Sequence, residues 1–181
     1  MIKKLYLLLV ILFALSFVAC DESEEMSKYA NWKERNEAFM DSLARVYKPG
    51  GDLFRIEDER NKGAYIYYEK LDTAKTKKDP PPFYTSKVTM FYRGMYINGD
   101  VFDENFSGDV PSDFDTPSTF GVNQVITGWT EILQIMHPDD RFKVYIPYKS
   151  GYGTSTSSSG IMAYSTLIFD MKMVNIELYP K

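Results

Sequence analysis

The side chains that most often carry covalent catalysis are scarce in this sequence. His137 is the single histidine, and it stands in a Met-His-Pro-Asp-Asp turn. A histidine base needs a nucleophile within hydrogen-bond reach, and the chain contains no Gly-x-Ser-x-Gly or similar motif. We therefore interpret His137 as a surface turn residue and expect no catalytic triad.

Large aromatic side chains suggest a different kind of site. They recur through the C-terminal half in a fixed order with a few polar and aliphatic residues: Tyr92, Phe102, Asp103, Val125, Ile126, Trp129, Tyr152 and Phe169. Taken singly, Trp129, Phe169 and Val125 have the pattern of ordinary core residues, and Tyr152 that of an aromatic in a Gly-Tyr-Gly turn. Only the order in which these residues recur argues for a common site.

The order and spacing of these segments resemble the FKBP-type peptidyl-prolyl cis-trans isomerases, the family that binds macrolides such as rapamycin. The segments lie within roughly residues 85–178 and read VTMFYRG, NGDVFDEN, VITGWTEILQIM, VYIPYKSGYG and STLIFDMKMV. The resemblance implies a catalyst of rotation about X–Pro bonds. It also implies chemistry that uses no metal, no cofactor and no nucleophile.

The same resemblance implies roles for individual residues. It assigns catalysis to Tyr92, Asp103, Tyr152 and Phe169, and substrate binding to Phe102, Phe120, Val125, Ile126, Trp129 and Ile161. Trp129 would form the floor under the proline ring, and the backbone N–H of Ile126 would donate to a substrate carbonyl. Tyr152 would donate its hydroxyl near the rotating bond, while Asp103 would accept hydrogen bonds at the rim.

The sequence departs from the family pattern in two loops. Ile161 is followed by Met162-Ala163, where the family often has Ile-Pro-Pro, and the preceding stretch 154–160 is rich in Ser and Thr. We expect this segment after Tyr152, the flap, to be more flexible than in the family, with lower catalytic activity or an altered substrate preference. The loop 104–119 is longer and more acidic than in small members of the family, but its acids lack the spacing of a calcium loop, so we expect no metal site.

The N-terminus has the layout of a bacterial lipoprotein signal. Lys3 and Lys4 precede an apolar run, and residues 1–19 read as a signal peptide. The lone cysteine, Cys20, follows in a segment that resembles a lipobox, so we expect it to carry a lipid anchor to the membrane. Residues 20–28 form an acidic tether, which is either a solvated spacer or an export signal resembling that of surface lipoproteins in the Bacteroidetes.

The remaining chain divides into an N-terminal helix with an extension at 29–82 and an isomerase domain at 83–181. Apolar residues three and four apart predict a helix from Tyr29 to Tyr47. This helix either packs on the domain or forms a stalk, with a dimerisation helix or a chaperone-like arm as the functional alternatives. Residues 52–62 read as a charged loop, 64–69 as a strand and the proline triplet 80–82 as a spacer.

The domain itself reads as mostly β-structure. Alternation predicts strands at 88–93, 142–146 and 167–173, and helical spacing runs from Ile126 to Met136. The pattern predicts an α+β fold in which a curved antiparallel sheet wraps one short helix. The FKBP fold has this architecture.

Together these features predict an isomerase lipoprotein of the bacterial cell envelope, attached to the outer membrane on its periplasmic or surface side. Its partners would be proline-containing polypeptides, with macrolides as candidate inhibitors. The net charge of −4 argues against nucleic-acid binding, which needs clustered Lys and Arg. The alternative function is a non-catalytic FKBP-like chaperone or peptide-binding lipoprotein.

Overall fold

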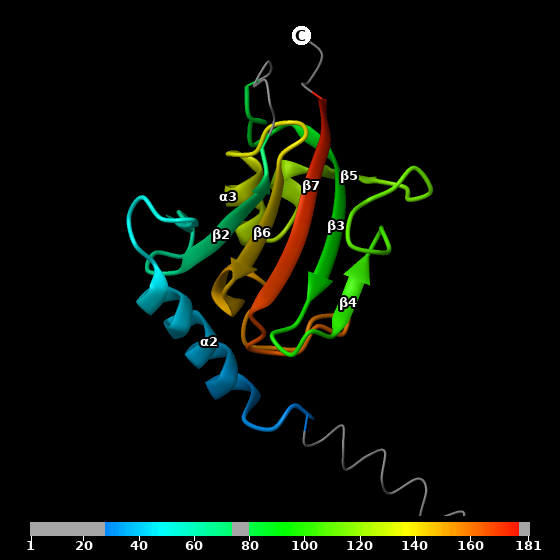
Figure 1. Ribbon diagram of the computed structural model, residues 1–181. Coiled ribbons are helices and arrows are strands. Elements are labelled where there is room, and N and C mark those ends of the chain that lie inside the picture. Colours follow the sequence, from blue (N-terminus) through cyan, green and yellow to red (C-terminus); the bar gives the residue numbers. More distant parts are fainter. Residues whose placement is uncertain (1–27, 74–79, 178–181) are drawn as a thin grey trace, which may run out of the picture. The chain divides into compact units, whose positions relative to one another are not determined.

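The computed structural model describes residues 28–73 and 80–177 (Figure 1). The expected signal peptide, Cys20 and nearly all of the acidic tether therefore lie outside the described residues. Within the described ranges, no helix has the length and apolar character needed to cross a membrane. The chain divides at Trp32 into two units. In the described part of the first, the rings of Tyr29 and Trp32 meet edge to face at 5.1 Å.

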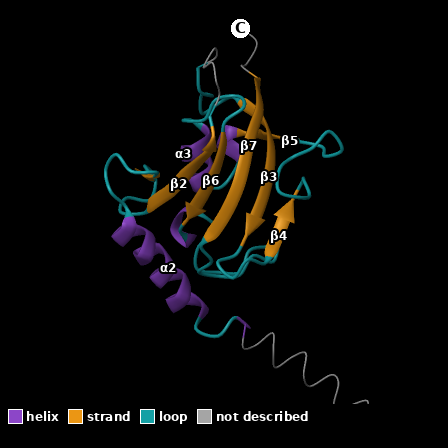
Figure 2. Cartoon of the chain, in the orientation of Figure 1, coloured by secondary structure: helices purple, strands orange, loops and turns teal. Residues whose placement is uncertain are grey.

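The second unit is built on one antiparallel sheet of seven strands (Figure 2). Its main path runs β1-β2-β6-β7-β3-β4, and β5 pairs with β3. The elements are α2 (Trp32–Val46), β1 (Leu53–Glu57), β2 (Tyr65–Asp72), β3 (Lys87–Met95), β4 (Val101–Glu104), β5 (Ser118–Gly121), α3 (Thr127–Leu133), β6 (Arg141–Ile146) and β7 (Leu167–Glu177). Two short 3-10 helices, η1 (Val122–Gln124) and η2 (Tyr148–Ser150), complete it.

The core lies between one face of this sheet and α3. Strand residues on that face alternate with outward ones, as strand geometry requires, and Met90, Phe142 and Met171 are almost completely buried. The helix approaches β6 closely at Gly128, where an added Cβ would lie 2.4 Å from Cγ2 of Ile146. The predicted α+β fold, with a curved antiparallel sheet, one short helix against it and a helix before it, is confirmed.

The region 52–62, expected to be a loop, instead contains β1, so that prediction was wrong. Leu53 pairs with Glu69 and Glu57 pairs with Tyr65 on β2, and Phe54 stacks on Tyr68 at 5.2 Å. The charged residues that suggested a loop belong to an edge strand, where charges commonly protect the exposed edge. Because β2 pairs with β6, this hairpin belongs to the same sheet as the segment from residue 83 onward.

The second face of the sheet is covered by α2. Phe39, Met40, Leu43 and Tyr47 pack against a buried cluster of Tyr67, Tyr145 and Ile168. A buried polar contact fixes the helix further, because the Oδ1 of Asn36 accepts a hydrogen bond of 2.6 Å from the N–H of Thr166. Of the alternatives raised by the sequence, the structure shows a helix that packs on the domain.

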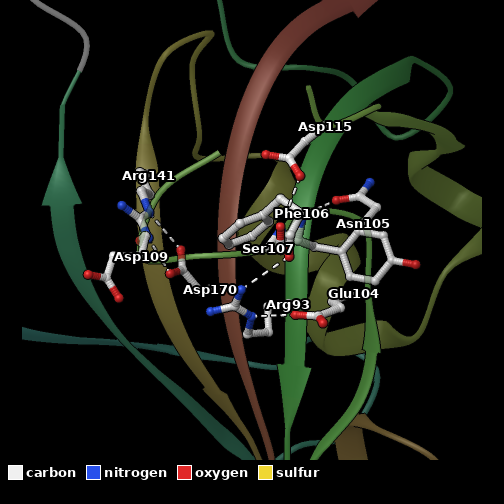
Figure 3. A network of polar contacts seen from close by, with 10 residues as sticks. Arg93, Glu104, Asn105, Phe106, Ser107, Asp109, Asp115, Arg141 and Asp170 are labelled. Atoms are coloured by element: carbon white, nitrogen blue, oxygen red, sulfur yellow. Dashed lines mark hydrogen bonds and ion pairs between the residues drawn. The ribbon is translucent and has the colours of Figure 1, made fainter. Parts of the chain in front are cut away.

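The long loop between β4 and β5 is held by a polar network (Figure 3). Arg93 pairs with Glu104 at 2.6 Å and donates to the carbonyl of Phe106, while Arg141 bridges Asp170 and the carbonyl of Asp109. The Asp115 carboxylate accepts from the backbone N–H of Ser107. These contacts position β4 and β5, the two strands that this loop connects. Across the described residues, no group of three His, Cys, Asp or Glu side chains could hold a metal ion.

Candidate active site

One pocket gathers nearly all of the predicted site residues. It has a volume of about 300 Å³ and is lined by Tyr92, Phe102, Asp103, Phe120, Gln124, Val125, Ile126, Trp129, Tyr152 and Phe169. The lining comes from β3, β4, β5, β7, η1, the start of α3 and the turn that follows η2. The fold therefore brings together residues that are as much as 77 positions apart, from Tyr92 to Phe169.

Edge-to-face contacts between aromatic rings build the walls. Trp129 is 4% exposed and meets Tyr92, Phe120 and Phe169 at ring-centre distances of 5.4, 5.3 and 5.2 Å. Phe102 meets Phe169 at 5.7 Å and 90°. Aromatic pairs favour this geometry because a ring's positive edge faces its neighbour's negative face. The buried indole Nε1 of Trp129 has no hydrogen-bond partner among the described residues, so packing alone orients this ring.

The polar groups of the pocket lie together at its rim. The hydroxyl of Tyr92 donates to the Oδ2 of Asp103 at 2.8 Å. Burial, the hydrogen bond to Asp103 and the negative charge of Asp103 all raise the pKa of Tyr92. Partial burial and the same charge raise the pKa of Tyr152, which is 42% exposed. Both phenols therefore stay protonated at neutral pH and can donate hydrogen bonds.

Gly94 on β3 leaves the space that two pocket rings occupy. A Cβ built there would lie 2.5 Å from Phe102 and 2.8 Å from Phe169. The Gly94→Ala change should cost about 1–3 kcal/mol through overpacking, which exceeds the gain of roughly 0.5–1 kcal/mol from replacing a strand glycine. We expect Phe102 to move into the pocket and ligand affinity to fall. Denaturant unfolding and ligand titration test these two effects, and Phe102→Leu in the same chain should recover part of the lost stability.

Ile161 is the one predicted pocket residue that does not line this cavity. It is buried and closes a turn with Ser157, whose N–H donates to the carbonyl of Ile161 while its Oγ accepts from the Ile161 N–H. The flap contacts the pocket indirectly, since the N–H of Met162 donates to the hydroxyl of Tyr96 at 3.4 Å and the Tyr96 ring lies 5.0 Å from Phe102.

Gln124 lines the pocket, although the sequence analysis did not single it out. Its position directly before the Val125-Ile126 pair was the signal available for finding it. Its side chain also fills space beside Gly121, where an added Cβ would lie 2.7 Å from the Gln124 Oε1.

His137 lies in a turn outside the pocket, as predicted, but not on the surface. Its side chain is only 13% exposed, which corrects the expectation of a surface residue. The buried carboxylate of Asp140 folds this turn inward, because it accepts a hydrogen bond of 2.8 Å from the N–H of His137.

Comparison with known proteins shows the family to which this chain is similar. Residues 81–174 match the FKBP-type peptidyl-prolyl cis-trans isomerase model. The chain is 36% identical over 96 residues to the macrophage infectivity potentiator of Trypanosoma cruzi, covering 53% of this chain and 46% of that protein. It is 38% identical over 115 residues to FkpA of Aeromonas hydrophila, covering 64% of this chain and 38% of the relative.

Solved structures show the same fold. The crystal structure of FkpA from Escherichia coli aligns with a TM-score of 0.63 at 24% identity, over 94% of this chain and 73% of that one. A peptidyl-prolyl cis-trans isomerase from Pseudomonas syringae pv. tomato aligns with a TM-score of 0.61 at 23% identity, over 83% of this chain and 96% of that one.

This chain belongs to the FKBP-type peptidyl-prolyl cis-trans isomerase family, as the sequence predicted. It spans about half the length of the curated relatives that it matches.

Proposed function

We propose that this protein catalyses cis-trans isomerisation of X–Pro bonds and so accelerates a slow step in the folding of exported polypeptides. The observation that carries the proposal is the pocket of edge-to-face aromatic rings with the Tyr92–Asp103 pair at its rim. Uncatalysed isomerisation takes tens to hundreds of seconds, which is long enough to limit folding.

The reaction breaks no covalent bond, so the pocket needs only to bind the twisted amide better than the planar one. Rotation faces a barrier of about 18–20 kcal/mol because amide resonance is lost on the way. Water stabilises the polar planar amide, and an apolar pocket removes that stabilisation. Trp129, at the centre of the aromatic cluster, is proposed as the floor under the proline ring.

Polar groups at the rim orient the substrate. The protonated hydroxyl of Tyr152 donates to the carbonyl next to the rotating bond, and the Ile126 backbone N–H donates to a second carbonyl. Asp103 holds the Tyr92 hydroxyl and contributes its negative charge at the rim, where no other lining side chain carries a charge. Phe169, Phe102, Phe120 and Val125 complete the apolar walls.

The cellular setting follows from the N-terminal segment. A lipid on Cys20 would hold the enzyme at a membrane of the cell envelope, since two or more acyl chains anchor a protein stably. The matched outer membrane protein MIP of Legionella longbeachae, 29% identical over 148 residues, supports an envelope location. Proline-containing segments of exported proteins are the proposed clients, and rapamycin-like macrolides are the proposed inhibitors.

The test is catalysed isomerisation of a Leu-Pro tetrapeptide, measured on the wild-type protein beside Tyr152→Phe and Asp103→Val. Tyr152→Phe removes one hydroxyl and should lower kcat/KM about 10-fold, the loss that about 1.4 kcal/mol of transition-state stabilisation represents. Asp103→Val should lower it as well, because it frees the Tyr92 hydroxyl and removes the rim charge. Circular dichroism should show that both variants keep the fold.

A non-catalytic peptide-binding module is the second candidate. It is based on the altered flap sequence, in which Met162-Ala163 stands where the family often has two prolines. Such a module would bind the tetrapeptide without accelerating its isomerisation. Binding with an unchanged isomerisation rate in the wild-type protein would select this alternative.

A further inference from the structure

A fully buried carboxylate lies outside the pocket and outside the part of the chain that matches the family model. Asp58, in the turn between β1 and β2, has no exposed surface. Its Oδ1 accepts from the N–H of Arg60 at 2.9 Å, and its Oδ2 accepts from Asn61 at 2.9 Å and from the Thr127 hydroxyl at 2.5 Å. These three donors stabilise the buried carboxylate, because burying a charge without partners is strongly unfavourable.

The Thr127 hydroxyl links the β1–β2 turn to the pocket. Thr127 is the first residue of α3, and the preceding residue, Ile126, provides no side-chain cap. The Thr127 hydroxyl also lies 3.2 Å from the carbonyl of Ser150, two residues before Tyr152. The Asp58–Thr127 contact thus lies where the segments carrying Ile126, Trp129 and Tyr152 meet.

We propose that Asp58 is a positioning residue for the pocket, which fixes the start of α3 against the segment that leads to Tyr152. The proposal rests on the isomerase function proposed above. It gives the β1–β2 hairpin a role in catalysis, although the family match begins only at residue 81. Asp58 does not line the pocket itself and acts through Thr127.

The ionised form of Asp58 is the one that this geometry needs, because all three partners donate hydrogen bonds. Burial raises its pKa, but the hydroxyls of Thr127 and Ser150, the Asn61 side chain and the Arg60 N–H together outweigh burial and leave the pKa below its ordinary value. An asparagine here would turn an N–H₂ group toward at least one donor, so Asp58→Asn cannot satisfy all three donors.

The experiment compares Asp58→Asn with Asp140→Asn in the full chain. Asp140 is a matched control, since it is 2% exposed and accepts from the His137 N–H in the turn after α3, away from the pocket. Three readouts are needed: thermal unfolding, kcat and KM for the tetrapeptide, and the NMR resonances of the Ile126 amide and the Trp129 indole N–H.

We expect Asp58→Asn to lower kcat/KM by about 10-fold relative to the control, because displacements of less than 1 Å at a site have effects of this order. Both pocket resonances should shift in Asp58→Asn and stay in place in Asp140→Asn. Thr127→Val should reproduce the loss, and Thr127→Ser, which keeps the hydroxyl, should retain activity. Thr127→Val also keeps the test valid if Asp58→Asn does not fold.

Two results would overturn the proposal. One is a destabilised Asp58→Asn protein whose kcat/KM and pocket resonances match those of the control. The other is a Thr127→Val protein with wild-type kcat/KM and an unshifted Trp129 indole resonance; the Ile126 amide adjoins the changed residue and is not used for this variant. If the wild-type protein has no isomerase activity, the proposed function fails, and the two resonances alone decide whether Asp58 positions the pocket.

Discussion

Replacing Trp129 with alanine should remove about 3–5 kcal/mol from the free energy of unfolding, as truncation of a buried tryptophan usually does. It should also lower kcat/KM for a proline peptide by about 100-fold, since the groups around the substrate would lose their alignment. Trp129 contacts the rings of Tyr92, Phe120 and Phe169. Its loss would therefore both open a cavity and release three pocket walls.

Phe142→Ala separates the two effects of the Trp129 change. Phe142 is 1% exposed and stacks on Tyr68 at 5.3 Å, but it does not line the pocket. The Phe142→Ala protein should lose a similar amount of its free energy of unfolding. Under conditions in which it is folded, its kcat/KM should stay near the wild-type value. Denaturant unfolding and isomerisation at one low temperature provide the comparison. Equal losses of kcat/KM in the two variants would show that Trp129 matters only for folding.

Replacing Asp58 with alanine should lower the free energy of unfolding by about 3 kcal/mol or more, because each hydrogen bond to a charged group contributes about 1.5–3 kcal/mol. Three hydrogen bonds to the carboxylate are lost in this variant, from the Arg60 N–H, the Asn61 side chain and the Thr127 hydroxyl, all of which are only partly buried. Urea unfolding at neutral pH measures the difference. A loss below about 1 kcal/mol, typical of a surface change, would contradict the structure at this position.

The contribution of Asp58 should also depend on pH in a defined direction. Its pKa is lower in the folded protein than its ordinary value of 3.8, so folding favours the ionised form. Its stabilisation is therefore complete above the ordinary pKa and is lost as pH falls through the folded value. The pKa of nearby Glu131 shifts in the opposite direction, because burial and the charges of Asp58 and Glu59 raise it.

The difference in stability between wild type and Asp58→Ala should consequently narrow as the pH falls below about 4, the ordinary range of an aspartate pKa. Urea unfolding of both proteins from pH 7 to pH 3 measures this. Glu131 is present in both chains, so most of its own titration cancels in the comparison. A difference that stays constant over this range would contradict a depressed pKa for Asp58.

Much of the pocket could be predicted because local sequence carries its strongest signals. The alternation around Val88 and Phe142 marked central strands, and the spacing from Ile126 to Met136 marked the short helix. The aromatic residues followed in a family-specific order. A family pattern retains such side chains in order even when the segments between them differ in length.

What the sequence did not reveal depends on contacts between distant residues. The charged residues around β1 led to the prediction of a loop, although an edge strand tolerates such residues and a central strand does not. The partnership of Asp58 with Thr127 joins positions 69 residues apart, and no local pattern reports it. The family resemblance predicted Ile161 at the pocket, whereas this part of the flap forms hydrogen bonds to Ser157 and Ile161 does not line the cavity.

The central claim is that the aromatic pocket accelerates rotation about an X–Pro bond. Exchange NMR spectroscopy of a Leu-Pro tetrapeptide tests it most directly, because the cis and trans forms give separate signals and uncatalysed exchange is too slow to connect them. With a small fraction of wild-type protein present, we expect exchange peaks between the two forms, which weaken strongly when Trp129→Ala replaces the wild type. A folded wild-type protein that binds the peptide and yields no exchange peaks would contradict the account.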